Sequence, residues 1–304
     1  MDVNVVYNTP YEMPLGYWIA TYFYLTGLSA GSFVISVLST LGGKTEFKPI
    51  GRIGALMAPI LLVLAPSTLI VDLEQPLRFW HLFLYLNPKS PITYGSFLLT
   101  AYPINGIIYA YYLFTGRDKL AKRLGIIGIP LAIATHGYTG FILALGKGRA
   151  LWSTALMPTL FIVSAMVSGF AMMIVLAAIR NKYFYGKMTS EQREADKTLI
   201  CQLGTYLAFA ILFDLFLVFN DILVLLTSTE EALRVAKLIL FGDFSLEFVF
   251  VELIIGGLVP LVILLSPKFN KALGNTVFAS LLTLLGVYSM RVVVVIAGQS
   301  LPLH

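Results

Sequence analysis

Acidic side chains are rare in the apolar stretches of this sequence, and their spacing predicts acid–base chemistry. Asp214 and Asp221 are seven residues apart, which places both on one face of a helix. Glu247, Glu252 and Arg291 lie in two further apolar runs. A charged group in hydrocarbon costs on the order of 3 kcal/mol, so such residues usually face the protein interior and mark a site or a pathway. We therefore treat these five residues as a candidate proton pathway.

A structural role would explain the same residues differently. Arg291 would then neutralise a neighbouring acid and hold the last three apolar runs together. Asp214 would be a packed, protonated acid. The sequence leaves both interpretations open.

A second group of reactive side chains lies between Asp72 and His81, at the end of an apolar run. This segment combines Asp72 and Glu74 with Arg78, His81 and two aromatic residues. Pro76 stops a helix, and aromatic residues favour the membrane interface. An interfacial anchor would not need the two acids, so the segment favours a functional site near the membrane surface, with an anchor as the alternative.

Histidine and cysteine are too few for a metal-based redox centre. His136 lies near the centre of an apolar run, whereas His81 and His304 do not, so no two histidines are placed to hold a haem from facing helices. The single cysteine, Cys201, excludes an internal disulfide and any iron–sulfur cluster or structural zinc site held by this chain alone. We expect no metal in the chain, so two-electron chemistry would rely on its substrate.

The elements that position these residues are long apolar runs. The chain has 304 residues, of which 58% are hydrophobic and 12% charged, and its mean hydropathy is +0.84. A bilayer core of about 30 Å needs roughly 20 apolar residues per helix, and the backbone must be hydrogen-bonded within each segment. The sequence therefore predicts an all-α integral membrane protein with eight transmembrane helices, at about 15–41, 51–73, 92–115, 124–145, 155–180, 198–226, 244–266 and 273–297.

The basic residues predict the orientation in the membrane. Fourteen lysines and arginines follow the first, third, fifth and seventh runs, and six lie in the loops on the other side. By the positive-inside rule the first set is cytoplasmic, so both termini and the loops at 72–91, 146–154 and 227–243 are extracytoplasmic. Most of the reactive side chains then lie in the outer half of the membrane. The net charge of +5 follows from this topology and does not indicate a nucleic-acid partner.

Several extracytoplasmic segments, taken in order, resemble the NrfD/PsrC family of polysulfide reductase-type membrane subunits. The resemblance is carried by Gly27–Gly31, Asp72–His81, Asn87–Ile92, Tyr138–Ala144, Arg149–Trp152, and Arg291 leading into Ala297–Gln299. It covers the first half of the chain well and the second half mainly through the last two spans.

The resemblance implies a haem-free, quinol-oxidising or quinone-reducing subunit of a respiratory oxidoreductase complex in a bacterial or archaeal plasma membrane. Its cofactor would be a quinone, with menaquinone expected. Its partners would be a four-cluster ferredoxin-like iron–sulfur subunit on the exterior face and a molybdopterin catalytic subunit. The implied division is an exterior segment over residues 1–14, a first four-helix bundle with the quinone site over 15–145, connecting elements over 146–197, and a second four-helix bundle over 155–304.

The resemblance also implies a quinone pocket. Tyr138 corresponds to the tyrosine that hydrogen-bonds the quinone, and Glu74 to the pocket acid. Ile19 and Tyr22 stand where the family has an amide and an imidazole, so one quinone carbonyl must be held differently, by Tyr22 or His136. The expected catalytic bases are Glu74, His136 and Asp72, and the expected quinone-binding residues are Tyr138, Tyr22, Glu74, Ile19, Arg78 and His81.

Two other function classes use the same features. A secondary transporter would bind an ion or small solute at the buried acids and Arg291, although such sites favour broken helices near the midplane. A passive anchor for a redox partner would bind no ligand. Proton translocation by Asp214, Asp221, Glu247, Glu252 and Arg291 is left open, because the inner half of the spans has almost no ionisable side chains.

Overall fold

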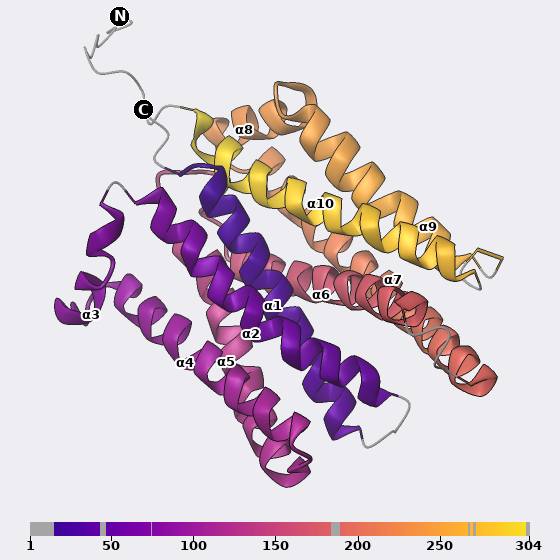
Figure 1. Cartoon of the computed structure of the whole chain (residues 1–304). Helices are drawn as coiled ribbons and strands as arrows, with labels where there is room; N and C mark the ends of the chain where they lie inside the picture. The colour runs from indigo at the N-terminus through magenta and orange to yellow at the C-terminus, as the bar shows by residue number, and fades with distance from the viewer. Residues whose placement is uncertain are drawn as a thin grey trace, which may run out of the picture.

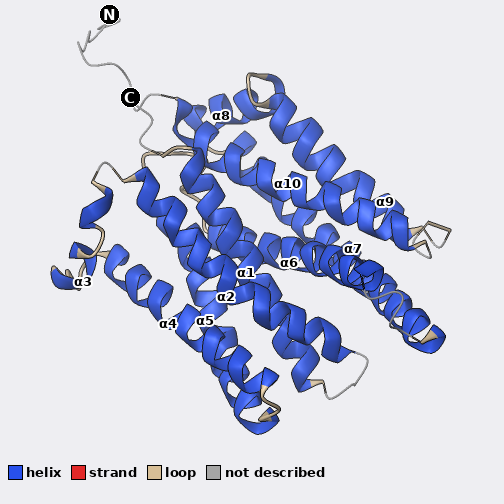
Figure 2. Cartoon of the chain, in the orientation of Figure 1, coloured by secondary structure: helices blue, strands red, loops and turns tan. Residues whose placement is uncertain are grey.

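The computed structural model describes residues 15–42, 47–73, 75–183, 189–266, 268–269 and 272–301. These residues are helical apart from short connections, and no strand occurs among them (Figure 2). Eight helical segments are long and apolar enough to cross a membrane, which confirms the predicted fold class. They are α1 (Tyr17–Leu41), α2 (Lys48–Asp72), α4 (Pro91–Phe114), α5 (Asp118–Ala144), α6 (Leu156–Tyr183), α7 (Ser190–Thr227), the continuous pair η4 (Leu246–Leu258) and α9 (Val259–Leu265), and α10 (Leu273–Ser300).

The helices form two groups with a shared centre (Figure 1). In the first half of the chain, α1 and α4 each contact both α2 and α5. In the second half, α7 and α10 each contact both α6 and α9. The groups meet where α1 contacts α6 and α10, and where α5 contacts α6. The division into two bundles at the stated residues stays a prediction, because α1 and α6 belong to the contacts of both halves.

Both ends of the described chain lie at one end of the molecule, which we call the terminal face; it carries Leu15 and Leu301. The connections at 73–90, 145–155 and 228–245 lie at the same face, because successive spans alternate in direction. They contain η2 (Pro76–Arg78), α3 (His81–Leu84) and α8 (Glu230–Phe241). Figure 1 shows α8 beside the end of α10 and α3 at the edge of the first half. The predicted orientation would place this face outside the cell.

The longest helix, α7, extends well beyond its apolar run. It has 38 residues, which at 1.5 Å per residue is about 57 Å, almost twice the hydrocarbon thickness. A capping box starts it: the Thr189 hydroxyl accepts from the Gln192 backbone, and the Gln192 side chain accepts from the Thr189 backbone. Asp196 in the added turns pairs with Arg180 of α6 at 3.2 Å. The extension therefore ties α6 and α7 together at the face opposite the termini.

The seventh span is wound as a π-helix over Leu246–Leu258. In a π-helix the backbone bonds join residues five apart, so Glu247 and Glu252 lie one turn from each other. An α-helix would place residues five apart about 140° apart around its axis. The π winding thus brings both glutamates toward one side of the span.

Closely packed glycines let the central helices approach. Gly31 of α1 and Gly169 of α6 are in backbone contact, and a methyl group added at Gly31 would overlap the Ala165 carbonyl oxygen. Small residues at helix interfaces are the usual means of close approach in a membrane, where no hydrophobic effect drives helices together. The contact between the two halves of the chain therefore depends on the absence of a side chain at Gly31.

We expect Gly31→Ala to destabilise the protein by about 1–3 kcal/mol, because the added methyl group forces α1 and α6 apart. The measurement is the midpoint of thermal unfolding in detergent. Gly274→Ala is the matched control, since Gly274 also lies in a helix and has nothing within 4 Å of the added methyl group. Equal unfolding midpoints for the two variants would contradict the assigned packing.

Candidate functional site

Two tyrosines come together near the terminal face. Tyr22 of α1 is buried and Tyr138 of α5 half-buried, and their phenols are close enough to interact electrostatically. The Tyr138 ring lies over Gly95 of α4, where an added methyl group would overlap it. Neither hydroxyl forms a hydrogen bond within the described part of the chain. The pair therefore presents two O–H donors to a ligand with carbonyl acceptors.

The remaining residues predicted for this site lie at different depths. Ile19 is buried on α1, one turn from Tyr22. Asp72 ends α2, and its carboxylate faces Gly16 at the start of α1. Glu74, the predicted pocket acid, lies outside the described residues.

Arg78 and His81 lie in the surface segment that follows α2. Arg78 is exposed, and the His81 ring contacts Trp80 and Tyr85 edge-on, with ring centroids 4.1 Å and 5.6 Å away. No contact of either residue with the tyrosine pair occurs among the described hydrogen bonds and ring contacts. Their assignment to a quinone site stays a prediction.

His136 points away from the tyrosine pair. It is two residues before Tyr138 on α5, which corresponds to about 200° around the helix axis. Its imidazole is 1% exposed and faces α1, α6 and α10. A methyl group at Gly27 of α1 would lie 3.0 Å from its Cε1 atom, and the Phe161 ring of α6 is 5.8 Å away. The residue therefore lies at the junction of the two halves.

Arg291 of α10 is fully buried at the same junction. Its Nη2 atom lies 3.3 Å from His136 Nε2, 2.5 Å from the Ser164 hydroxyl and 3.4 Å from the Phe161 carbonyl oxygen. Its guanidinium carbon is 3.9 Å from the centre of the Phe161 ring, a cation–π contact. It forms no direct ion pair among the described residues, although Asp214 and Glu252 are near enough to act on it electrostatically, so the interpretation of Arg291 as the group that neutralises a neighbouring acid stays open.

The buried acids of the second half form a row. Asp214 of α7 and Glu252 of η4 line a cavity of about 20 Å³, and Asp221 and Glu252 line a second one of about 30 Å³. Met290 of α10 borders both. Each volume has room for about one water molecule. Glu252 thus lies between the two aspartates, with space for water on either side.

The row continues toward the terminal face. Thr154, in the connection between α5 and α6, lies close enough to the Asp221 carboxyl group to interact with it. Glu247 lies one π turn from Glu252, and its backbone carbonyl accepts a hydrogen bond of 2.8 Å from Ser289. The spacing of seven between Asp214 and Asp221 predicted their shared face. Thr154, Phe161 and the π winding had no signal in the sequence that would single them out.

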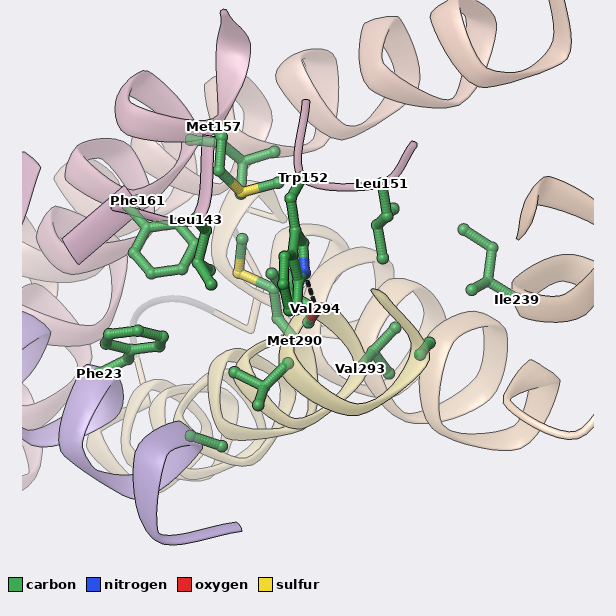
Figure 3. Close-up of a cluster of buried hydrophobic side chains, with 14 of the residues drawn as sticks. Phe23, Leu143, Leu151, Trp152, Met157, Phe161, Ile239, Met290, Val293 and Val294 are labelled. Atoms are coloured by element: carbon green, nitrogen blue, oxygen red, sulfur yellow. Dashed lines mark hydrogen bonds between the residues drawn. The ribbon is translucent and has the colours of Figure 1, made fainter. Parts of the chain in front are cut away.

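A clamp closes the terminal face over this row. The Trp152 indole donates a hydrogen bond of 2.6 Å to the Val294 carbonyl and fills the space beside Gly298 (Figure 3). Arg149 donates to the Leu301 carbonyl, and Gln299 exchanges two hydrogen bonds with the backbone of Leu15. The clamp joins the start of α1, the connection at 145–155 and the end of α10.

No group of three or more histidine, cysteine or acidic side chains suited to hold a metal ion occurs in the segments that the structure describes. The reactive side chains of the site are phenols, carboxyl groups, one imidazole and one guanidinium.

The family model described as "Polysulphide reductase, NrfD" matches residues 5–302. The sequence is 28% identical to the C subunit of selenate reductase from Mesobacillus selenatarsenatis, over 94% of its own length and 74% of that protein. It is 29% identical to the Hdr-like menaquinol oxidoreductase integral membrane subunit of Archaeoglobus fulgidus, over 99% and 74%. It is 27% identical to the C polypeptide of polysulfide reductase from Wolinella succinogenes, over 95% and 96%.

We expect Trp152→Phe to destabilise the protein by about 1–3 kcal/mol, because the buried hydrogen bond from the indole to the Val294 carbonyl is lost while an aromatic ring is kept. Thermal unfolding in detergent measures the change. Trp18→Phe is the control, since the Trp18 side chain is half-exposed at the same end of the molecule. A clamp of no structural importance would give two variants that unfold at the wild-type temperature.

Proposed function

Because the chain belongs to the NrfD polysulphide reductase family, we propose that it is the membrane subunit of a respiratory complex that oxidises a quinol or reduces a quinone. Its relatives include membrane subunits of reductases and of a menaquinol oxidoreductase, from bacteria and an archaeon. We propose the same location in a prokaryotic plasma membrane, menaquinone as the carrier, and an iron–sulfur subunit with a catalytic molybdopterin subunit at the terminal face.

The observation that carries the proposal is the pair of free phenols, Tyr22 and Tyr138. A quinone head group has two carbonyl acceptors, and hydroxyl groups that donate to no other protein group can donate to them. A quinol supplies two electrons and two protons when bound. The Tyr138 ring packs against Gly95 of α4, and the Tyr22 side chain is buried, so both donors are positioned before a ligand arrives. The donor set therefore fits a quinone.

We propose Asp72 and Glu74 as the groups that receive the protons. Asp72 is the last residue of α2, where the span meets the terminal face, so a proton that it takes can pass to the surface. General bases work best when their proton affinity suits the operating pH, and partial removal from water moves a carboxyl group toward that condition. The chain has too few cysteines to hold an iron–sulfur cluster. The electrons therefore leave to the iron–sulfur subunit that we propose at the terminal face.

Removing the Tyr138 hydroxyl tests the phenol pair. We expect Tyr138→Phe to lower kcat/KM for a quinol analogue about tenfold, the equivalent of one hydrogen bond worth about 1.4 kcal/mol. Combination with Glu74→Gln should lower it further, because a proton acceptor is lost as well. Tyr111→Phe is the control, since Tyr111 is exposed on α4 far from the terminal face. Oxidation at the unaltered rate by the double variant would rule the site out.

We also propose that the acid row conducts protons in the second half of the chain. Asp214, Glu252 and Asp221 are separated by two water-sized cavities, and Thr154 extends the row to the terminal face. Water between carboxyl groups can relay protons over distances that side chains alone do not bridge. This proposal is independent of the quinone site, which lies in the first half.

A proton-counting experiment tests the row. In vesicles that contain the whole complex, Glu252→Gln should lower the number of protons released at the terminal face per electron, because an amide does not exchange protons as a carboxyl group does. Glu230→Gln on α8 is the control, as an exposed glutamate at the same face. An unchanged proton-to-electron ratio in Glu252→Gln would exclude the row as a pathway.

A further inference from the structure

The contact between His136 and Arg291 joins the two halves of the molecule through one pair of side chains. His136 belongs to α5, beside the helices of the proposed quinone site. Arg291 belongs to α10, beside the helices that carry the acid row. Ser164 and Phe161 of α6 lie between them and hold the guanidinium group. Both side chains are at most 1% exposed, so neither can exchange its partner for bulk water.

The chemistry of the two groups fixes which atom donates. A guanidinium group has only donors, so His136 Nε2 must accept the hydrogen bond from Arg291 Nη2. The imidazole in this arrangement carries its proton on Nδ1, which is buried and has no hydrogen-bond partner among the described residues. Ser164 has the same constraint: its hydroxyl donates to the Phe161 carbonyl at 3.0 Å, which leaves its oxygen free to accept from Arg291. His136 cannot bind a second proton at Nε2 while Arg291 occupies that position.

The guanidinium group of Arg291 has a second set of possible partners, which are the buried acids of the second half. Its Nε and Nη1 atoms are buried and have no hydrogen-bond partner among the described residues. The charged and titratable groups that act on it are Asp214 of α7, Glu252 of η4 and Tyr24 of α1. One oxygen of Asp214 and one of Glu252 are also buried without a partner. For His136, the only charged neighbour among the described residues is Arg291.

We propose that His136 and Arg291 form a proton-dependent switch between the two halves. With His136 neutral, the guanidinium group rests on Nε2. When Nε2 takes up a proton, two donors and two positive charges face each other, and the guanidinium group moves to Glu252 and Asp214. A guanidinium group beside a carboxyl group favours the ionised form, so a proton held in the acid row is released. Transfer of the His136 proton to the carboxylate that released its own restores the first state.

The switch deepens the proposed function, on which its physiological role rests. The proton that reaches His136 comes from quinol oxidised in the first half, and the proton released leaves a carboxyl group in the second half. Proton number is conserved, since one is taken up for each one released. His136 then acts as a relay that senses oxidation rather than as the first base of the quinol. Arg291 is a positioning residue, because it acts only through the groups it contacts.

Nitrogen NMR of the histidines tests the first state directly. The chain has only three histidines, so the protein can be labelled with ¹⁵N-histidine in nanodiscs and His136 assigned by its loss in His136→Gln. We expect one protonated and one unprotonated ring nitrogen, with Nδ1 protonated, unchanged between about pH 5 and 8 where histidines ordinarily titrate. A wild-type spectrum with Nε2 protonated in that range would overturn the proposal without need of any variant.

Variants of Arg291 test the cause. Arg291→Gln keeps an N–H donor but removes the charge, so His136 should begin to titrate in the same pH range. Arg291→Lys restores the charge and should suppress the titration again. A His136 signal that is identical in all three proteins would overturn the proposal. These readouts need no quinone, so they hold or fail separately from the proposed function.

The second state is tested in vesicles that contain the whole complex. Glu252→Gln with Asp214→Asn removes the destination of the guanidinium group. This double variant should keep the wild-type His136 spectrum but release fewer protons per electron. A changed tautomer, or an unchanged proton-to-electron ratio, would contradict the link between the two halves. A wild-type complex that oxidises no quinol at all, with Nδ1 of His136 protonated as expected, would instead refute the proposed function alone.

Discussion

A buried guanidinium group is stabilised only by protein groups, because water cannot reach it. In this chain the buried guanidinium group is that of Arg291. Its burial is tolerable because α6 supplies a hydroxyl, a carbonyl and an aromatic face at one level, while α5 supplies an imidazole. A cation over an aromatic ring is worth about 2 kcal/mol or more once water is removed. One buried charge therefore contacts α5, α6 and α10 at a single level and adds to the packing between them.

The rest of the interior is arranged so that this charge can be approached closely. Gly27 makes room for the His136 ring, and the contact of Gly31 with Gly169 lets α1 lie directly on α6. On the other side of α1, hydroxyl groups tie the first half together: Tyr109 of α4 is within hydrogen-bonding distance of both Ser36 and Thr40. Such bonds saturate polar side chains where lipid offers none.

The sequence predicted the transmembrane helices well, and the contacts between their side chains less well. Eight spans follow from apolar length alone, because the bilayer imposes that length on every helix. The shared face of Asp214 and Asp221 follows from helical periodicity. The partner of Arg291 did not follow, since an acid is the expected neighbour of a buried cation and only three-dimensional packing brings His136 there. The π winding around Glu252 is equally invisible, because its apolar residues show no period that separates it from an α-helix.

The hydrogen bonds between Gln299 and Leu15 join residues that are 284 positions apart in the sequence. Spans are synthesised in order from the N-terminus, so α1 and α6 are made before α10. Only when α10 arrives can the clamp close and the guanidinium group find its acceptors. The contacts of Arg291 and the clamp can therefore form only after the last span is made. A chain that stops before α10 would leave α1 without its α10 contacts.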